Sequence, residues 1–138
     1  MTKMISRGEN ETFVFAREMA KKAVGGEVIT LNGNLGAGKT VFSKGFAAGL
    51  GIKEEITSPT FTIMNEYEGE KLTFCHIDAY RLHSGEEAYA AGLCDYLGAK
   101  NCVCVIEWAE NVRSVLPDDA INIEIKYVDE NTREIVVL

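Results

Sequence analysis

A glycine-rich segment between a short apolar run and a longer amphipathic run most constrains how this chain folds. Residues 33–40 read GNLGAGKT and fit the pattern G-x-x-x-x-G-K-[ST] without gaps. The β-branched run at 28–31 predicts a buried strand before this segment, and residues 39–50 predict a helix after it. The pattern forms a phosphate-binding P-loop when a strand precedes it and a helix follows it. We therefore predict that the chain binds a nucleoside triphosphate.

The composition of the segment follows from the chemistry of phosphate. Glycines allow the backbone to curl so that successive N–H groups point inward, and the following helix directs its positive end at the same place. Lys39 supplies a charge for the β- and γ-phosphates, and the Thr40 hydroxyl is placed to ligate Mg²⁺. We expect ATP, its product ADP and Mg²⁺ as the bound groups. The residues expected to bind the nucleotide here are Asn34, Leu35, Gly36, Ala37, Gly38, Lys39, Thr40 and Val41.

Helical and strand patterns alternate along the chain, so the expected class is α/β. We expect a P-loop NTPase-like three-layer fold, with a mixed central sheet flanked by helices and the strands 28–31 and 103–106 at its centre. Residues 1–138 are expected to form one domain. Further predicted elements are a helix at 12–23, strands at 61–67 and 72–78 joined by a turn at 68–71, a helix beginning at the capping box 84–87, and a hairpin of 121–127 and 134–138 turning at 129–131.

Charge and composition exclude some classes of function. The chain carries 14 basic and 21 acidic residues, a net charge of −7, which argues against nucleic acid as the primary ligand and against direct contact with RNA. No apolar run is long enough to span a membrane, and the first ten residues lack the apolar stretch of a signal peptide. We expect a cytoplasmic protein, a monomer when alone, whose four cysteines are buried thiols.

Two acidic residues follow apolar strands, where ligands bind in open α/β sheets. Glu107 follows the run 103–106, and Asp78 follows the run 72–77. A P-loop needs an acidic residue to help hold the metal. The hypothesis is that Glu107 ligates Mg²⁺, directly or through water, and that Asp78 orients or deprotonates the attacking water. Exchanging the two roles fits the sequence equally well.

Other polar and aromatic residues allow two interpretations each. The segment 57–60 is either a loop that senses the γ-phosphate or a plain surface turn. For Trp108 the residues favour core packing, and the alternative is a partly exposed aromatic near the phosphates or a partner surface. A structural or solvated role is favoured over a catalytic role for His76 and His83. Arg81 and Arg113 are favoured as surface residues, although either could touch phosphate or a partner.

Four blocks in order along the chain resemble the bacterial TsaE (YjeE) family. They are the P-loop at 33–40, Ser-Pro-Thr-Phe at 58–61, His-Ile-Asp-Ala-Tyr-Arg-Leu at 76–82, and Ile-Glu-Trp at 106–108. The P-loop alone is shared by very many proteins, whereas the four blocks together in a short chain are specific. Two positions depart from the family pattern: Val41 stands where a second hydroxyl residue is common, and Ala109 stands where proline is frequent.

The resemblance implies a cytoplasmic ATPase that works with two larger proteins. Those partners transfer a threonylcarbamoyl group to adenosine 37 of tRNA, and the nucleotide cycle of the small ATPase supports their turnover. The family pattern also implies roles for residues of this chain: Thr40 and Glu107 at Mg²⁺, Asp78 and Lys39 in hydrolysis, Thr60 in a switch-like loop, Thr12 near the nucleotide base, Trp108 at the active site, and Arg133 among the nucleotide-binding residues.

Two other functions remain as alternatives. The first is a small-molecule P-loop kinase, but such enzymes usually carry several arginines on a lid over the phosphates, and this chain has no arginine cluster. The second is a nucleotide-dependent interaction module with negligible catalysis. Because no arginine is obviously placed to stabilise the transition state, we expect slow hydrolysis that partners accelerate.

Overall fold

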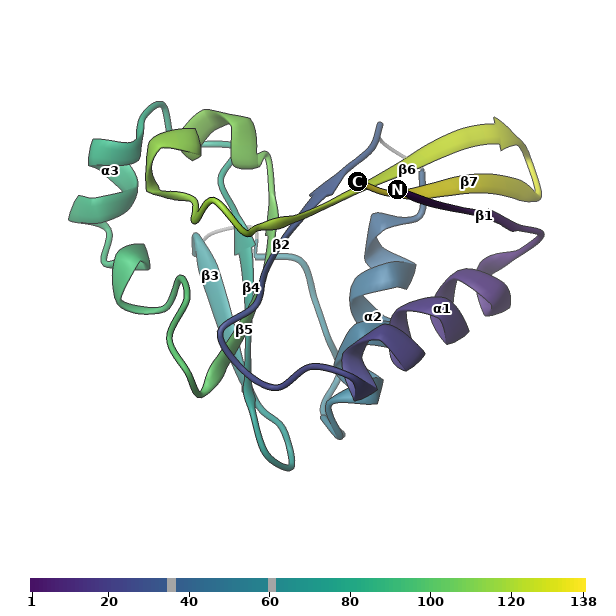
Figure 1. Ribbon diagram of the computed structural model, residues 1–138, viewed down its shortest axis with the longest axis horizontal. Coiled ribbons are helices and arrows are strands. Elements are labelled where there is room, and N and C mark those ends of the chain that lie inside the picture. Colours follow the sequence, from purple (N-terminus) through teal and green to yellow (C-terminus); the bar gives the residue numbers. More distant parts are fainter. Residues whose placement is uncertain (35–36, 60–61) are drawn as a thin grey trace.

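A computed structural model describes residues 1–34, 37–59 and 62–138. Its strands are β1 (Thr2–Ser6), β2 (Val28–Asn32), β3 (Met64–Glu68), β4 (Thr73–Asp78), β5 (Cys102–Glu107), β6 (Ile121–Asp129) and β7 (Thr132–Val137). Its helices are α1 (Glu9–Lys21), α2 (Lys39–Gly49) and α3 (Gly85–Ala90), with short 3-10 helices η1 (Leu93–Asp95) and η2 (Ala109–Val115). Figure 1 shows their arrangement.

The strands of the described residues form one seven-stranded sheet in the order β1-β7-β6-β2-β5-β4-β3. Strand β2 is parallel to both of its neighbours, β5 and β6, and β4 is parallel to β5. The outer pairs β3–β4, β6–β7 and β1–β7 are antiparallel. The prediction of a mixed sheet with the strands at 28–31 and 103–106 at its centre is therefore confirmed.

Helices cover both faces of the central strands, which gives three layers (Figure 1). On one face, α1 and α2 pack their buried residues, Phe42 and Phe46 among them, against Ile29 and Leu31 of β2. On the other face, α3, η1 and η2 cover Val28 and residues such as Ile106. The alternation of β2 side chains between the two clusters follows from the twofold repeat of a strand. The predicted α/β three-layer fold is confirmed.

The predicted elements and the observed ones differ mainly at their ends. The first helix begins at Glu9 rather than at residue 12, because two acidic residues in its first turn favour the positive helix end. The capping box behaves as expected, since the Ser84 hydroxyl accepts a hydrogen bond from the Glu87 amide at 3.2 Å. Strand β3 begins at Met64, and residue 61, where a strand was expected to start, lies outside the described residues.

Strand β1 was not predicted, because most of its residues are exposed and its sequence has no regular alternation. It forms only because β7 offers an edge on which it pairs, from Thr2 with Val137 to Ser6 with Arg133. The chain therefore closes on itself at this edge, with both ends of the molecule side by side in Figure 1.

The cysteine prediction holds for three of the four thiols. Cys75 of β4 and Cys102 and Cys104 of β5 are buried on the face of the sheet that α3 covers. Cys94 is partly exposed. Contact with the Cys104 thiol, together with burial, raises the pKa of Cys75, and burial raises the pKa of Cys102 to about 11. These thiols are thus held in the unreactive protonated form. Among the described residues, no helix has both the length and the apolar character needed to cross a membrane.

Candidate functional site

The two acidic residues predicted from the sequence lie next to each other where β4 and β5 end. Asp78 and Glu107, at these carboxyl ends of the strands, form the acidic edge of the sheet. In the parallel register of β4 and β5, Asp78 lies opposite Glu107, and the Ala79 amide donates to the Glu107 carbonyl at 3.0 Å. The Asn111 side-chain amide of η2 donates to the Ala79 carbonyl at 3.1 Å. These bonds tie the segments after β4 and β5 together, so both carboxylates stand on a rigid base.

The loop after β2 leads into α2 beside this acidic edge. Gly38 has φ of +103°, a left-handed conformation that favours glycine, and a Cβ added there would meet nothing within 4 Å. The backbone is thus open toward solvent at the first turn of an 11-residue helix, with the exposed Thr40 on that turn. Such a helix end attracts anions. Leu35 and Gly36, expected to bind nucleotide, lie outside the described residues, as does Thr60.

Lys39 and Glu107 connect the loop to the acidic edge. The Lys39 ammonium lies 3.4 Å from Glu107 Oε1, and both side chains are largely shielded from solvent. His76 Nε2 lies 3.2 Å from Glu107 Oε2. Burial opposes ionisation of Glu107, but the hydrogen bond with His76 and the charge of Lys39 outweigh it and hold the pKa of this carboxyl below its usual range. Glu107 is therefore a carboxylate at neutral pH.

Trp108 stands beside this ion pair rather than in the core. It is 41% exposed, so the interpretation as a core residue is wrong. The Lys39 ammonium lies 5.7 Å from the centre of its ring, and the Tyr80 ring meets it edge-on at 5.0 Å. Trp108 thus forms one wall beside the lysine that the sequence assigned to the phosphates.

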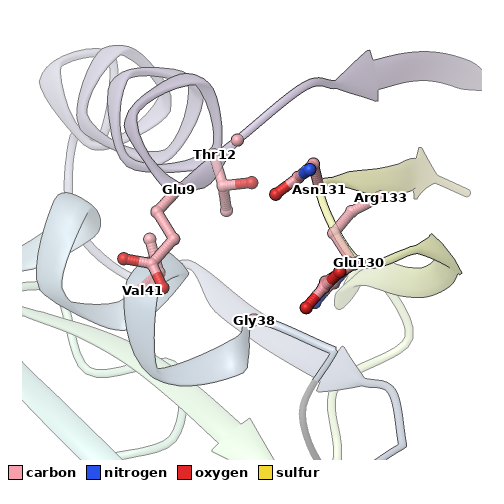
Figure 2. A pocket seen from close by; sticks show the side chains of 8 residues that line it. Glu9, Thr12, Gly38, Val41, Glu130, Asn131 and Arg133 are labelled. Carbon is pink, nitrogen blue, oxygen red and sulfur yellow. The ribbon is translucent and has the colours of Figure 1, made fainter.

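A cavity of about 280 Å³ opens on the other side of the Gly38 turn. Figure 2 shows its lining residues converging from α1, from the start of α2 and from the β6–β7 hairpin. They are Gly8, Glu9, Thr12, Gly38, Val41, Glu130, Asn131 and Arg133. Thr12, Val41 and Arg133, which were expected near the nucleotide, therefore share one cavity although they are far apart in the sequence.

Hydrogen bonds on both sides stabilise this cavity. Ser6 Oγ donates to the Gly8 carbonyl at 2.8 Å and lies 2.7 Å from Thr12 Oγ1, which fixes the start of α1. Arg133 Nε donates to the Ala37 carbonyl at 3.1 Å, which attaches the hairpin to the P-loop. The guanidinium of Arg133 also lies over the Tyr127 ring. Strand β1 is thus part of the support, because it supplies Ser6.

The remaining candidate residues differ in how they relate to Glu107. Asp78 accepts a hydrogen bond from the Tyr80 amide at 3.0 Å, a bond within its own turn, rather than a bond with Glu107. His83, Arg81 and Arg113 are exposed, as predicted for surface or solvated residues. His76 is 1% exposed and bonded to Glu107, so sequence reasoning missed its place in the site.

The sequence carries a signal for one of the missed site residues, His76, and none for the missed residues of the cavity. His76 precedes Asp78 by two positions on a strand, so the two side chains share a face, and this spacing could have placed the histidine near the acids. No local pattern marks Glu9, Glu130 and Asn131, because they are exposed and reach the cavity only through long-range packing.

The donors around the P-loop fit Mg²⁺ better than a softer metal. Glu107 offers a carboxylate and Thr40 a hydroxyl, and Mg²⁺ prefers one or two such oxygens together with substrate phosphates. Within the described part of the chain, no three His, Cys, Asp or Glu residues gather as a metal cage. A cation that is held mainly by nucleotide phosphates needs no such cage.

Comparisons with known proteins agree with this arrangement. The family model described as threonylcarbamoyl adenosine biosynthesis protein TsaE matches residues 6–135. A relative from Treponema pallidum, named tRNA threonylcarbamoyladenosine biosynthesis protein TsaE, is 43% identical over 138 residues, 96% of this chain and 97% of the relative. The protein of the same name from Bacillus subtilis is 44% identical over 125 residues, 91% of this chain and 77% of the relative.

A solved structure is similar over nearly the whole chain. The crystal structure of YdiB from Bacillus subtilis matches with a TM-score of 0.83 at 39% sequence identity, covering 99% of this chain and 83% of that one. Sequence and fold thus agree over the same residues that carry the P-loop and the acidic edge. The chain belongs to the TsaE family.

Proposed function

We propose that this chain binds ATP with Mg²⁺, hydrolyses it slowly, and thereby supports a partner complex that forms N6-threonylcarbamoyladenosine at position 37 of tRNA. The observation that carries the proposal is the 3.4 Å contact between Lys39, at the start of α2, and Glu107, at the end of β5. It joins the lysine of a P-loop to the acid that such sites use for the metal. The biosynthetic role is the one named for the relatives from Treponema pallidum and Bacillus subtilis.

The cavity beside Gly38 is the proposed binding place of the nucleoside. Its walls come from Thr12, Val41 and the β6–β7 hairpin, and it opens at the turn that would hold the phosphates. With the nucleoside there, the phosphates would lie over the first turn of α2, where amide groups and the helix dipole favour negative charge. Lys39 would then exchange its contact with Glu107 for a contact with phosphate.

In this proposal, residues of the acidic edge would bind the metal and position the attacking water. Thr40 and Glu107 would hold Mg²⁺, which supplies neutralisation of the negative charge on the phosphates. Asp78, fixed opposite Glu107 by the strand register, would orient or deprotonate the attacking water. Leu35, Gly36 and the switch-like Thr60 belong to the same proposal, although they lie outside the described residues.

The bonds that Arg133 already makes support slow hydrolysis by the isolated chain. Arg133 donates to the backbone carbonyls of Ala37 and Asp129, so its guanidinium is used for structure. An arginine that stabilises the transition state is worth roughly 10³–10⁵ in rate. We therefore expect the two larger partner proteins of the threonylcarbamoyl transfer complex to accelerate the cycle, and those partners rather than this chain to perform the transfer to tRNA.

The test measures binding and hydrolysis separately, with and without the partner proteins. A fluorescent ATP analogue should bind in the presence of Mg²⁺, and Lys39→Ala should weaken that binding at least about tenfold, the loss expected for one charged hydrogen bond. Lys44→Ala is the matched control, since Lys44 is an exposed lysine on the same helix. Equal binding by both variants would rule out the proposed phosphate site.

Hydrolysis is tested with Asp78→Asn and Glu107→Gln, which keep the shape of each side chain. We expect at least one of them to retain nucleotide binding and to lose roughly 10²-fold or more of the hydrolysis rate, the usual contribution of acid–base catalysis. Wild-type rates in both variants would contradict the assignment of the acids. Labelled phosphate that appears on a small acceptor rather than in solution would favour a kinase instead.

A further inference from the structure

We propose that His76 is a positioning residue for Glu107, which keeps the carboxylate in place when Lys39 moves to the phosphates. This inference rests on the proposed nucleotide site. It concerns a residue that acts through Glu107 and does not itself touch the nucleotide.

The two oxygens of Glu107 have different partners. Oε1 lies 3.4 Å from the Lys39 ammonium, and Oε2 lies 3.2 Å from His76 Nε2. A carboxylate can only accept hydrogen bonds, so Nε2 carries the proton of this pair. One partner therefore belongs to the P-loop helix, and the other belongs to strand β4, which pairs with the strand of Glu107 itself.

The His76 ring is buried and contacts side chains of β4, α2 and β5. Its ring stacks on that of Phe74, with centroids 5.8 Å apart and planes 10° from parallel. The Ser43 hydroxyl of α2 lies 3.5 Å from the same Nε2. At 1% exposure, the imidazole has no freedom to follow a moving partner. It is a fixed donor, whereas Lys39 is a long side chain whose rotamers can change.

The other ring nitrogen argues against a purely structural role. Among the buried side-chain nitrogen and oxygen atoms of the described residues, His76 Nδ1 is the one without a hydrogen-bond partner. Burying a polar atom without a partner costs free energy. An apolar residue would avoid that cost but would leave Glu107 without its donor. The bond to Glu107 is therefore the contact that explains a histidine at this position.

The consequence appears when Lys39 leaves. A lone carboxylate on a strand end would then be free to turn, and its geometry toward a cation would loosen. His76 keeps Oε2 in place, so that Oε1 stays directed at the space that Lys39 vacates. Partners of this kind orient metal-binding side chains, and their loss typically lowers metal affinity by roughly 10- to 100-fold.

The test measures how much Mg²⁺ is needed for the fluorescent ATP analogue to bind. His76→Gln places an amide donor about where Nε2 lies, whereas His76→Asn reaches only about as far as Nδ1. We expect the asparagine variant to raise the Mg²⁺ concentration at half-maximal binding roughly 10- to 100-fold, and the glutamine variant to restore most of the wild-type value. Binding measured with Mg²⁺ removed should be the same in all three proteins.

Thr73→Val is the matched control for loss of stability. Thr73 is another buried polar residue of β4, at the opposite end of the strand, and its hydroxyl bonds to Glu68. Melting curves for all variants separate folding from cation affinity. We expect the control to lower Tm and to leave the Mg²⁺ midpoint unchanged. Equal Mg²⁺ midpoints in wild type, His76→Asn and His76→Gln would overturn the inference.

A second readout uses the protein without nucleotide. Nitrogen NMR of the His76 ring should show a proton on Nε2, and His83→Gln leaves this histidine as the single one in the chain. An Nε2 without a proton would overturn the inference even if nucleotide binds as proposed. A wild-type protein that shows the Nε2 form but binds no nucleotide would overturn both the inference and the proposed function, since the inference depends on that site.

Discussion

At the scale of single residues, the backbone of Trp108 is the unusual feature of the site. Among the described residues, it is the one residue other than glycine with a positive φ, at 60°. A left-handed conformation costs a residue with a Cβ about 1–2 kcal/mol. The turn places the Trp108 ring beside Lys39 directly after Glu107, so the strain coincides with the place where lysine, acid and aromatic ring meet. Strain of this kind is concentrated at functional sites.

This strain predicts an order of stability between two truncations. Trp108→Gly and Trp108→Ala both remove the ring and its contacts with Tyr80 and Lys39. Glycine tolerates the left-handed conformation, so the glycine variant should be more stable than the alanine variant by about 1 kcal/mol. Urea unfolding of the two variants measures the difference. An alanine variant that is equally or more stable would show that the positive φ is not strained.

At the scale of elements, the close packing of α1 on α2 depends on glycines of α2. A Cβ added at Gly45 would overlap the backbone carbonyl of Phe13, and one added at Gly49 would overlap that of Arg17. Glycine inside a helix costs about 1 kcal/mol relative to alanine. Here the close approach of the two helices offsets that cost, and it brings the start of α1, which carries Thr12, to the cavity beside Gly38.

Gly45→Ala should therefore destabilise the protein despite the better helix propensity of alanine. The clash is with backbone, which cannot move aside as a flexible side chain can, and overpacking of this kind costs roughly 1–3 kcal/mol. Lys44→Ala, at an exposed neighbouring position on the same helix, should change stability by less than about 0.5 kcal/mol. Chemical denaturation of both variants tests the prediction, and a Gly45→Ala protein more stable than wild type would disprove it.

At the scale of the whole molecule, the site is assembled from segments that are distant in the sequence. The bond from Arg133 to Ala37 joins residues 96 positions apart, and the bond between His76 and Glu107 joins residues 31 apart. Both ends of the chain contribute, because β1 supplies Ser6 and β7 supplies Arg133. A ligand that contacts all of these segments binds only the folded chain.

Binding should therefore raise thermal stability, by an amount that grows with the logarithm of the ligand concentration once it exceeds the dissociation constant. At 100 times the dissociation constant, ligand linkage stabilises the folded state by about 2.7 kcal/mol. For a domain of this size that corresponds to a rise in Tm on the order of 10 °C. Melting curves with Mg²⁺ and ATP should show the full rise in wild type and Lys44→Ala, and about half of that rise or less in Lys39→Ala, because a tenfold weaker site is stabilised by only about 1.4 kcal/mol at the same concentration. A rise of the same size in Lys39→Ala would mean that ATP stabilises the protein at another site.

Much of the fold was predictable because its signals are local. The P-loop pattern, the apolar strands that form the centre of the sheet and the Ser84 cap each depend on residues within a few positions of one another. The family resemblance also indicated residues of one site: the structure brings Lys39 and Glu107 into contact and places Thr12 and Arg133 on one cavity. Their roles with nucleotide and Mg²⁺ stay predictions.

The sequence by itself determined that a strand, a glycine-rich segment and a helix follow one another, and that each of two acids stands at the end of an apolar strand. Only the tertiary structure decided that β1 pairs with β7, that Trp108 is exposed beside Lys39, and that the buried His76 donates to Glu107. The physical reason is that local patterns reflect propensity and hydrophobic period, whereas these contacts depend on the register of strands and on helix packing. Neither is encoded within a few neighbouring residues.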